Sequence, residues 1–188
     1  RSILFSTIKE MKEEKDFIFG IRAVLEAIKA DKLIDKLVIR RGLTGELSHE
    51  LMSLVNELHI PYQLVPNERI SRITPKNHQG VIAFMSPIEF QNIEQIIPSL
   101  FEAGKTPFIV ILDKVTDVRN FGAITRTAEC AGVDAIIIPE KGSARISGDA
   151  VKTSAGALHK IPVCRVQNLL NTIKYLKSSG LQVIAATE

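Results

Sequence analysis

Four apolar segments alternate with helical segments through the second half of the chain. They lie at 107–113, 134–139, 160–166 and 181–187, and each is typical of a strand buried in a sheet. Strands that alternate with helices pair in parallel through right-handed crossovers. We therefore expect an α/β domain on a four-stranded parallel sheet over 107–188, with ligand chemistry at the carboxyl ends of its strands.

The helix after the first of these strands carries the most informative side chains. Asparagine is a strong N-cap residue, so the pattern predicts a helix from Asn120 to Ala131. Gly122 in its first turn lets another segment or a ligand approach closely. Arg126 lies about 200° around the helix from the apolar stripe and so points away from the sheet. That stripe is expected to consist of Ile124, Ala128 and Ala131.

The first half of the chain predicts a smaller α/β domain over 16–88. Apolar residues with helical spacing mark helices at 21–30 and 46–58, and Asn67 can cap a short helical turn. Strands are expected at 36–40, 62–65 and 80–85. Because helices and strands interleave, this half is expected to form its own compact core.

Two segments lie outside these domains. Residues 1–15 are expected to be an extension, in which Met11 and the charged residues after it resemble a natural start. Residues 89–106 are expected to be a linker that carries a helix, since apolar residues recur there on one helical face. These residues are Ile93, Ile96, Ile97 and Leu100.

Charge and composition limit the class of protein. The net charge is +3, and 105–177 holds eleven Lys and Arg against six Asp and Glu, which suits a phosphate-bearing partner. No apolar run approaches the roughly 18 residues of a membrane span. Cys130 and Cys164 stand alone and the four histidines lie far apart, so we expect buried free thiols, no metal site and a cytoplasmic location. With 5% aromatic residues and no Trp, base-stacking surfaces are not evident.

Two motifs in the second half resemble a known family. The pattern D-x-V-x-D-x-x-N-x-G-A-I-x-R-T-A-x-x-A-G at 113–132 is similar to motif 1 of the SpoU/TrmH family of RNA 2′-O-methyltransferases, part of the SPOUT superfamily. One departure is Val118, where many members have proline, and it should affect loop rigidity more than chemistry. The run K-T-S-A-G-A-L at 152–158 resembles the S-A-G-A segment of that family.

The first half resembles the RNA substrate-binding domain that precedes the catalytic domain in the same family. The residues that carry this resemblance lie near the two ends of the domain: F-G-I-x-x-V-L-E-A at 19–27 and H-Q-G-V at 78–81. The resemblance covers residues 16–188 in all. It implies a small α/β RNA-binding domain followed by a SPOUT-type α/β domain, and a homodimer.

The resemblance also implies a reaction and its catalytic residues. The reaction is methyl transfer from S-adenosylmethionine to a ribose 2′-hydroxyl of structured RNA, with rRNA favoured over tRNA. The motif 1 residues of the catalytic centre correspond to Asn120 and Arg126. The spacing alone favours a different role for Arg126, an exposed ion pair with Asp117 or Glu129. Thr187, at the end of the last expected strand, is the one cofactor-binding candidate.

Five residues are candidates for RNA binding. The structural alternatives are a solvated strand end for Arg40 and Arg41, a turn with structural hydrogen bonds for His78, and a solvated loop near Ser154. The candidates are Arg40, Arg41, His78, Arg119 and Ser154.

The two cofactor motifs of the family are not in this sequence. These are a G-E-G-like and an S-L-N-V-S-like motif, which form the C-terminal trefoil knot. We therefore expect the chain to lack the knot and to be inactive as written. The alternative is a non-catalytic RNA-binding protein with a degenerate methyltransferase domain. A nucleotide-binding Rossmann enzyme is disfavoured because no G-x-G-x-x-G follows a strand.

Overall fold

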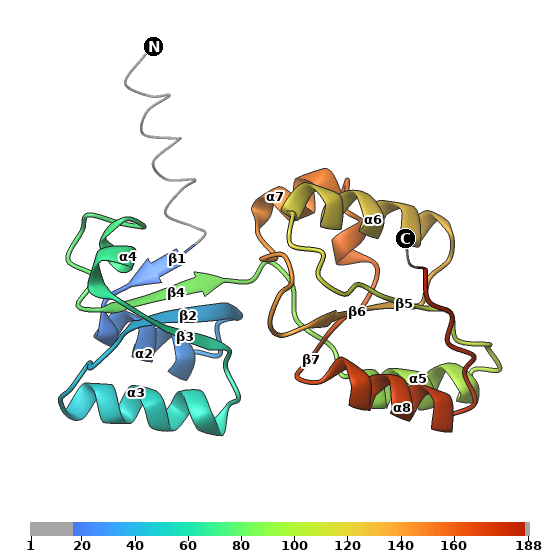
Figure 1. Ribbon diagram of the computed structural model, residues 1–188, viewed down its shortest axis with the longest axis horizontal. Helices are drawn as coiled ribbons and strands as arrows, with labels where there is room; N and C mark the ends of the chain where they lie inside the picture. The colour runs from blue at the N-terminus through green and yellow to red at the C-terminus, as the bar shows by residue number, and fades with distance from the viewer. Residues whose placement is uncertain (1–16, 187–188) are drawn as a thin grey trace, which may run out of the picture. The chain divides into compact units, whose positions relative to one another are not determined.

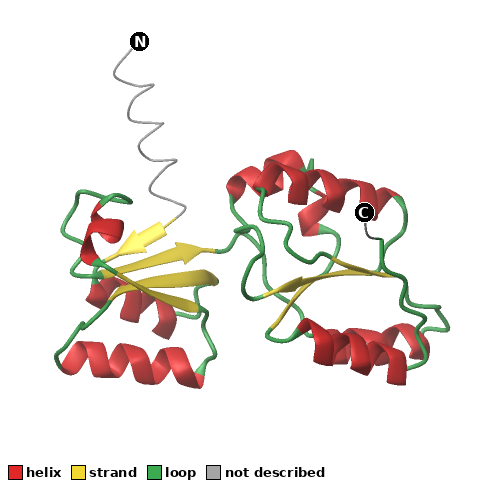
Figure 2. Ribbon diagram, viewed as in Figure 1, coloured by secondary structure: helices red, strands yellow, loops and turns green. Residues whose placement is uncertain are grey.

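The computed structural model describes residues 17–186. They divide into two compact units, with the boundary along the chain between Pro87 and Ile88. The first unit is built on a mixed four-stranded sheet and the second on a parallel three-stranded sheet (Figures 1 and 2). The predicted α/β fold with a parallel sheet in the second half is confirmed. No helix within residues 17–186 is long and apolar enough to cross a membrane.

The first unit has the strand order β1-β4-β2-β3. β4 pairs antiparallel with both of its neighbours, and β2 pairs parallel with β3. The helices and strands predicted here are present, with ends that differ by a few residues. The elements are β1 (Phe17–Phe19), α2 (Ile21–Lys29), β2 (Ile34–Arg40), α3 (Glu46–Glu57), β3 (Tyr62–Val65), α4 (Asn67–Ser71) and β4 (Val81–Met85).

α2 and α3 cover one face of this sheet, and α4 lies on the other (Figure 1). Val24 and Leu51 are fully buried against Leu37 of the sheet because apolar residues recur on one side of both helices. Asn67 is the first residue of α4 rather than its cap. Pro66 holds the N-cap position, and its carbonyl accepts the first helical hydrogen bond.

The second unit has the strand order β5-β6-β7, with parallel pairing throughout. Its central strand, β6, is buried along its whole length, as its unbroken apolar run predicts. The elements are α5 (Ile93–Glu102), β5 (Ile109–Ile111), α6 (Val118–Cys130), β6 (Ala135–Pro139), α7 (Gly148–Thr153), a 3₁₀ turn (Ala157–His159), β7 (Val163–Val166) and α8 (Leu169–Ser178).

Helices cover both faces of the second sheet (Figures 1 and 2). Ile136 and Ile138 of β6 pack toward α6 and α7, while Ala135 and Ile137 pack toward α5 and α8. Alternate side chains of a strand point to opposite faces, so one apolar strand supplies both cores.

The helix predicted within the linker at 89–106 is α5, and it is part of the second unit. Ile93 and Ile97 are buried against Ile137 of β6 and Leu176 of α8. The Asn92 side chain caps the helix by accepting the Glu94 N–H at 2.9 Å. The segment therefore does not act as a linker, because its apolar face completes one side of the second core.

The predicted fourth strand is not formed by the residues that the structure describes. Residues 181–186 pair with no strand, and Ile184 is 82% exposed. Apolar composition indicates a tendency to be buried, but a parallel strand also needs a neighbouring edge and cover on both faces. β5 consequently lies at an edge of the three-stranded sheet, and its three residues are half-buried rather than buried on both faces.

Candidate active site

The loop between β5 and α6 is held by backbone hydrogen bonds on both sides. The Leu112 N–H donates to the Ile137 carbonyl at 2.9 Å, and the Ala144 N–H donates to the Val115 carbonyl at 2.7 Å. Asp113 is exposed between these two points. The loop therefore presents polar groups at the carboxyl end of β5, where parallel sheets place their ligands.

α6 begins before Asn120, with Asp117 as its N-cap residue. The Asp117 carboxylate accepts the Asn120 N–H at 2.8 Å, which satisfies a backbone donor that the helix itself leaves free. The predicted cap, Asn120, lies instead in the first turn. Asp117 was predicted only as an ion-pair partner, although an aspartate just before a helical run is a recognisable N-cap signal.

Replacing Asp117 with alanine removes this acceptor and a negative charge beside the helix N-terminus. We expect the free energy of unfolding to fall by about 1 kcal/mol, measured by urea denaturation. Asp113→Ala is the matched control, since this exposed aspartate caps no helix, and its effect should stay within about 0.5 kcal/mol. Equal losses in the two variants would contradict the capping role.

The buried stripe of α6 differs from the predicted one. Phe121 is 1% exposed and Thr125 is fully buried, with its hydroxyl donating to the Phe121 carbonyl at 2.8 Å. Ala128 is buried as predicted, but Ile124 is only half-buried and Ala131 is exposed. Thr125 can enter the core because its hydroxyl is satisfied within its own helix.

α7 packs closely against α6 at Gly122. A Cβ at this position would overlap the Thr153 Oγ1 and would lie 2.8 Å from the Thr153 Cβ and 3.0 Å from the Ser154 nitrogen. The close approach predicted at Gly122 is therefore made by another segment of the chain. This contact joins the two motifs at 113–132 and 152–158.

Ser154 is fully buried at the end of α7 and is not available to RNA in this structure. Its hydroxyl donates to the Val151 carbonyl at 2.9 Å and accepts the Leu158 N–H at 3.3 Å. The prediction that Ser154 contacts RNA is not supported. The hydroxyl instead links α7 to the 3₁₀ turn that follows it.

Arg119 and Arg126 are both exposed and lie on one face of α6. Seven residues separate them, which places them about 20° apart around the helix. Neither acid expected to pair with Arg126 does so within the described residues: the Asp117 carboxylate caps the helix, and Glu129 binds Lys160 at 3.2 Å. The structure therefore leaves two guanidinium groups on one exposed face beside the loop.

Asn120 does not lie on that face. It is six residues before Arg126, about 120° away around the helix, and its side chain is exposed. In the described part of the chain, no hydrogen bond or ion pair joins Asn120 to Arg126. The two side chains stand on either side of the exposed surface of α6.

In the first unit, Arg40 and Arg41 are exposed at the end of β2, while His78 forms structural hydrogen bonds. The His78 Nδ1 accepts the Gly80 N–H at 3.0 Å, and its Nε2 lies 3.2 Å from the Ser71 hydroxyl. Both ring nitrogens are therefore occupied, as expected of a turn. The three residues remain predicted RNA contacts.

The two cysteines have different surroundings. Cys164 is buried, and burial raises the pKa of its thiol from 9.0 to about 11, so it stays protonated at neutral pH. Cys130 is exposed at the end of α6, contrary to the prediction that both thiols are buried. Among residues 17–186, no three His, Cys, Asp or Glu side chains gather as metal ligands would. Thr187 lies outside the described residues.

Both halves of the chain match models of known families. Residues 107–188 match the family described as "SpoU rRNA Methylase family", and residues 17–91 match "RNA 2'-O ribose methyltransferase substrate binding". The two matches follow the two halves of the chain and include the 113–132 and 152–158 motifs. The two matches thus identify an RNA methyltransferase domain preceded by a substrate-binding domain.

Curated relatives agree with this assignment. The Bacillus subtilis protein named "Putative TrmH family tRNA/rRNA methyltransferase YacO" is 30% identical over 174 residues, which cover 93% of this chain and 70% of the relative. A TrmH family relative from Staphylococcus saprophyticus is 36% identical over 171 residues, covering 91% and 69%. The chain belongs to the SpoU/TrmH family of RNA methyltransferases.

Solved structures of the family are more distant. A crystal structure of AdoMet-bound rRNA methyltransferase from Sinorhizobium meliloti is 24% identical, with a TM-score of 0.42. The SpoU methyltransferase AviRb from Streptomyces viridochromogenes, in complex with AdoMet, is 18% identical, with a TM-score of 0.40. The alignments cover 87% and 86% of this chain, but the chain spans only 58% of the length of each of these proteins.

Proposed function

We propose that the protein transfers a methyl group from S-adenosylmethionine to a ribose 2′-hydroxyl of structured RNA, with rRNA as the substrate. Family membership supports methyl transfer to RNA and this donor. The observation that carries the proposal is Arg126, exposed on α6 beside the β5–α6 loop and without an ion-pair partner among residues 17–186. A structural arginine of this helix would be expected to pair with Asp117 or Glu129.

Arg126 can act on the RNA without accepting a proton. A guanidinium group keeps its charge at neutral pH and binds phosphate through two parallel N–H groups. In the proposed site, Arg126 binds the phosphate beside the target ribose and stabilises the negative charge that develops on the 2′-oxygen. Arg119, on the same face, binds a neighbouring phosphate, and another group accepts the hydroxyl proton.

We propose that the Asn120 side chain contacts the target nucleotide and does not contact Arg126. Its exposed amide group offers both a donor and an acceptor, and Asp117 fixes the backbone from which it projects. Arg126 and Asn120 would then approach the nucleotide from two sides of α6. Such positioning of the reacting hydroxyl supports catalysis by lowering the entropy cost of alignment.

The described residues do not fit the methyl donor. Residues 181–186, which lead to the candidate Thr187, form no strand, and Ala185 and Ala186 are exposed rather than part of a buried wall. We assign the donor to no residue among 17–186 and derive no step through it. Thr187 stays the candidate for that contact, and we propose that the active form is a homodimer.

A non-catalytic RNA-binding protein is the second candidate function. The exposure of residues 181–186 favours it, because an exposed segment after α8 offers no enclosed site for a donor. It accounts less well for Arg126, whose free guanidinium group has no role in the fold. Methyl transfer by the natural protein that carries these residues distinguishes the two functions.

The position of the methyl group tests the reaction directly. A 2′-O-methyl group removes the nucleophile that cleaves RNA in alkali, whereas methylation of a base leaves it in place. We expect RNA treated with the natural protein and radiolabelled S-adenosylmethionine to carry its label in alkali-resistant dinucleotides. Label released in mononucleotides would contradict ribose methylation, and no incorporation at all would favour the non-catalytic alternative.

A further inference from the structure

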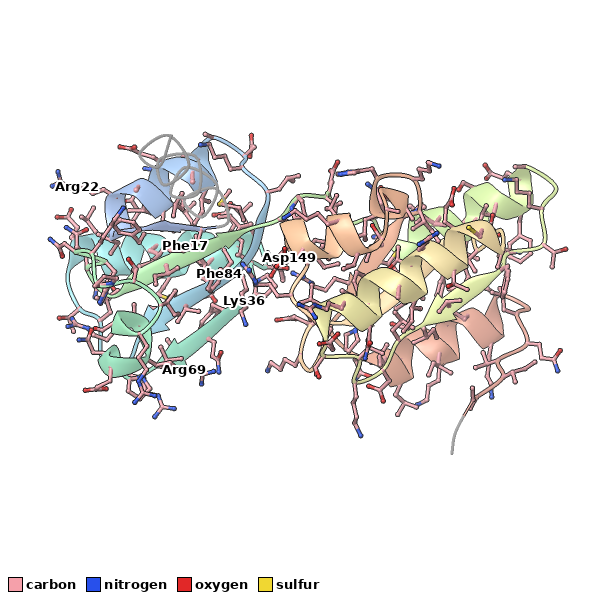
Figure 3. All side chains as sticks on the ribbon, turned by 90° about the horizontal axis from the view of Figure 1, so that it is seen from above. Phe17, Arg22, Lys36, Arg69, Phe84 and Asp149 are labelled. Atoms are coloured by element: carbon pink, nitrogen blue, oxygen red, sulfur yellow. The ribbon has the colours of Figure 1, made fainter. Side chains whose placement is uncertain are left out.

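Phenylalanine and lysine side chains form a row across the α4 side of the first sheet. Phe17 of β1 lies opposite Phe84 of β4, and Phe84 lies opposite Lys36 of β2. Partners in adjacent strands share a face and stand about 4.8 Å apart. Figure 3 shows Phe17, Phe84 and Lys36 following one another across the sheet. Phe19, two residues after Phe17, lies on the same face.

The three rings form one cluster, which we call the aromatic face: Phe17, Phe19 and Phe84. The ring centroids of Phe17 and Phe84 are 5.9 Å apart and tilted by 61°, and those of Phe17 and Phe19 are 6.3 Å apart. All three are half-buried rather than enclosed. A cluster of this kind offers flat apolar surface to a partner.

The helix on this side of the sheet is too short to cover the aromatic face. α4 has five residues, and its one buried side chain, Ile70, packs on Val38, Val65 and Ile82. The opposite face is covered by α2 and α3, of nine and twelve residues. The described part of the first unit therefore has one well-covered face and one partly covered face.

Charge separates the two faces in the same way. α2 and α3, on the covered side, together contain four glutamates against two basic residues, Arg22 and Lys29. Residues 67–79, which include α4, contain Arg69, Arg72 and Lys76 against Glu68 alone. The Lys76 Nζ lies 5.8 Å from the centre of the Phe19 ring, and Lys36 ends the row of rings. The aromatic face is thus bordered by positive charge.

We propose that the aromatic face binds unpaired nucleotides of the substrate RNA. Bases stack on Phe17 and Phe84, and Lys36 and Lys76 hold the adjoining phosphates. Stacking on aromatic side chains within a basic surface is how proteins hold single-stranded nucleic acid, since every base has a flat face. The inference rests on the proposed function in one respect, that RNA is the substrate. It assigns the first unit a preference for single-stranded segments.

Binding of a short uridine-rich RNA that carries one 2-aminopurine tests this proposal with the whole chain. We expect Phe17→Leu and Phe84→Leu to weaken binding about tenfold each and to remove the fluorescence change that stacking produces. Leucine keeps the apolar volume beside Ile70, and circular dichroism checks the fold. Phe17→Tyr, which keeps the ring, should bind like the unmodified protein. Phe101→Leu is the matched control, because Phe101 is 45% exposed on α5 of the second unit.

The charged border gives a second measurement. Lys36→Gln should make the slope of log affinity against log salt concentration shallower by about 0.7, the value for one lost phosphate contact with a single strand. Lys32→Gln, an exposed lysine outside the row, should leave the slope unchanged. Equal effects of the two substitutions would contradict a phosphate contact at Lys36.

Four other outcomes overturn the proposal. If the Phe17→Leu and Phe101→Leu variants bind equally well while RNA binding persists, the RNA lies elsewhere and the proposed methyl transfer is unaffected. If the fully paired form of the same RNA binds as tightly, and the Phe variants weaken its binding as much, stacking of unpaired bases is excluded. If the Phe variants change self-association in sedimentation but not RNA binding, the face is a protein contact. If the unmodified chain binds neither form of RNA, the proposed RNA substrate fails as well.

Discussion

Arg126→Ala is expected to lower the rate of methyl transfer by about a hundredfold to a thousandfold at saturating RNA, the usual cost of removing a group that stabilises charge in the transition state. The free energy of unfolding should change by less than about 0.5 kcal/mol, because the side chain is exposed and contacts no acid among the described residues. Initial rates with radiolabelled S-adenosylmethionine and urea denaturation of the natural protein measure the two effects.

Two further substitutions show which property of Arg126 matters. Arg126→Lys keeps the charge but loses the planar group that binds phosphate through two N–H groups, so its rate should lie between those of the unmodified protein and the alanine variant. Arg22→Ala removes an exposed arginine from α2, far along the chain, and should leave the rate unchanged. A normal rate in Arg126→Ala would remove this residue from the active site, whichever RNA is used.

Gly122→Ala is expected to destabilise the second unit by about 2 kcal/mol, although alanine is a better helix former than glycine. The helix preference favours alanine by about 1 kcal/mol. Against this, the new Cβ would lie 3.0 Å from the backbone nitrogen of Ser154 and 2.8 Å from the Thr153 Cβ, so α7 must shift away from α6. Overpacking of this kind costs about 1–3 kcal/mol, and the contact with backbone places it at the upper end.

A double substitution separates the steric effect from the helix preference. Thr153→Ala removes the Oγ1 that the new Cβ would overlap but leaves the backbone contact in place. The Gly122→Ala/Thr153→Ala variant should therefore recover part of the lost stability, which a double-mutant cycle in urea measures as a coupling energy. If Gly122→Ala alone stabilised the protein, the close packing of α6 and α7 would not be a real constraint.

Local patterns predicted most of the helices and strands. Val24, Leu25 and Ile28 recur at helical spacing, and all three are buried in α2. Asn168 caps α8 by accepting the Asn171 N–H at 3.0 Å, a contact made within one turn of the chain. Such features depend on neighbours in sequence, so they can be inferred from the chain alone.

The errors concern contacts between distant segments. The strand expected at 181–187 fails because pairing depends on a neighbouring edge that the segment's own composition does not reveal. Ser154 was predicted to contact RNA, but its position against α6 depends on Gly122, more than thirty residues earlier in the chain. Its burial could not be inferred from the S-A-G-A pattern.

The aromatic face shows the same limit. Phe17 and Phe84 stand at opposite ends of the first unit in sequence, and only the antiparallel pairing of β1 and β4 brings their rings to 5.9 Å. A low aromatic content does not exclude a stacking surface, because a few rings suffice when the sheet gathers them. For the α6 site, by contrast, the motif predicted Arg126, and the structure added the cap at Asp117.

The exposed thiol at the end of α6 makes the site accessible to chemical labelling without any substitution. Cys130 follows Arg126 by four residues, so the two side chains are neighbours on the helix surface. Cys164 is buried with a pKa of about 11, so a thiol-directed dye at neutral pH attaches to Cys130 in preference to it. The protein thus carries a natural attachment point for a fluorophore within one helical turn of the residue expected to meet the RNA.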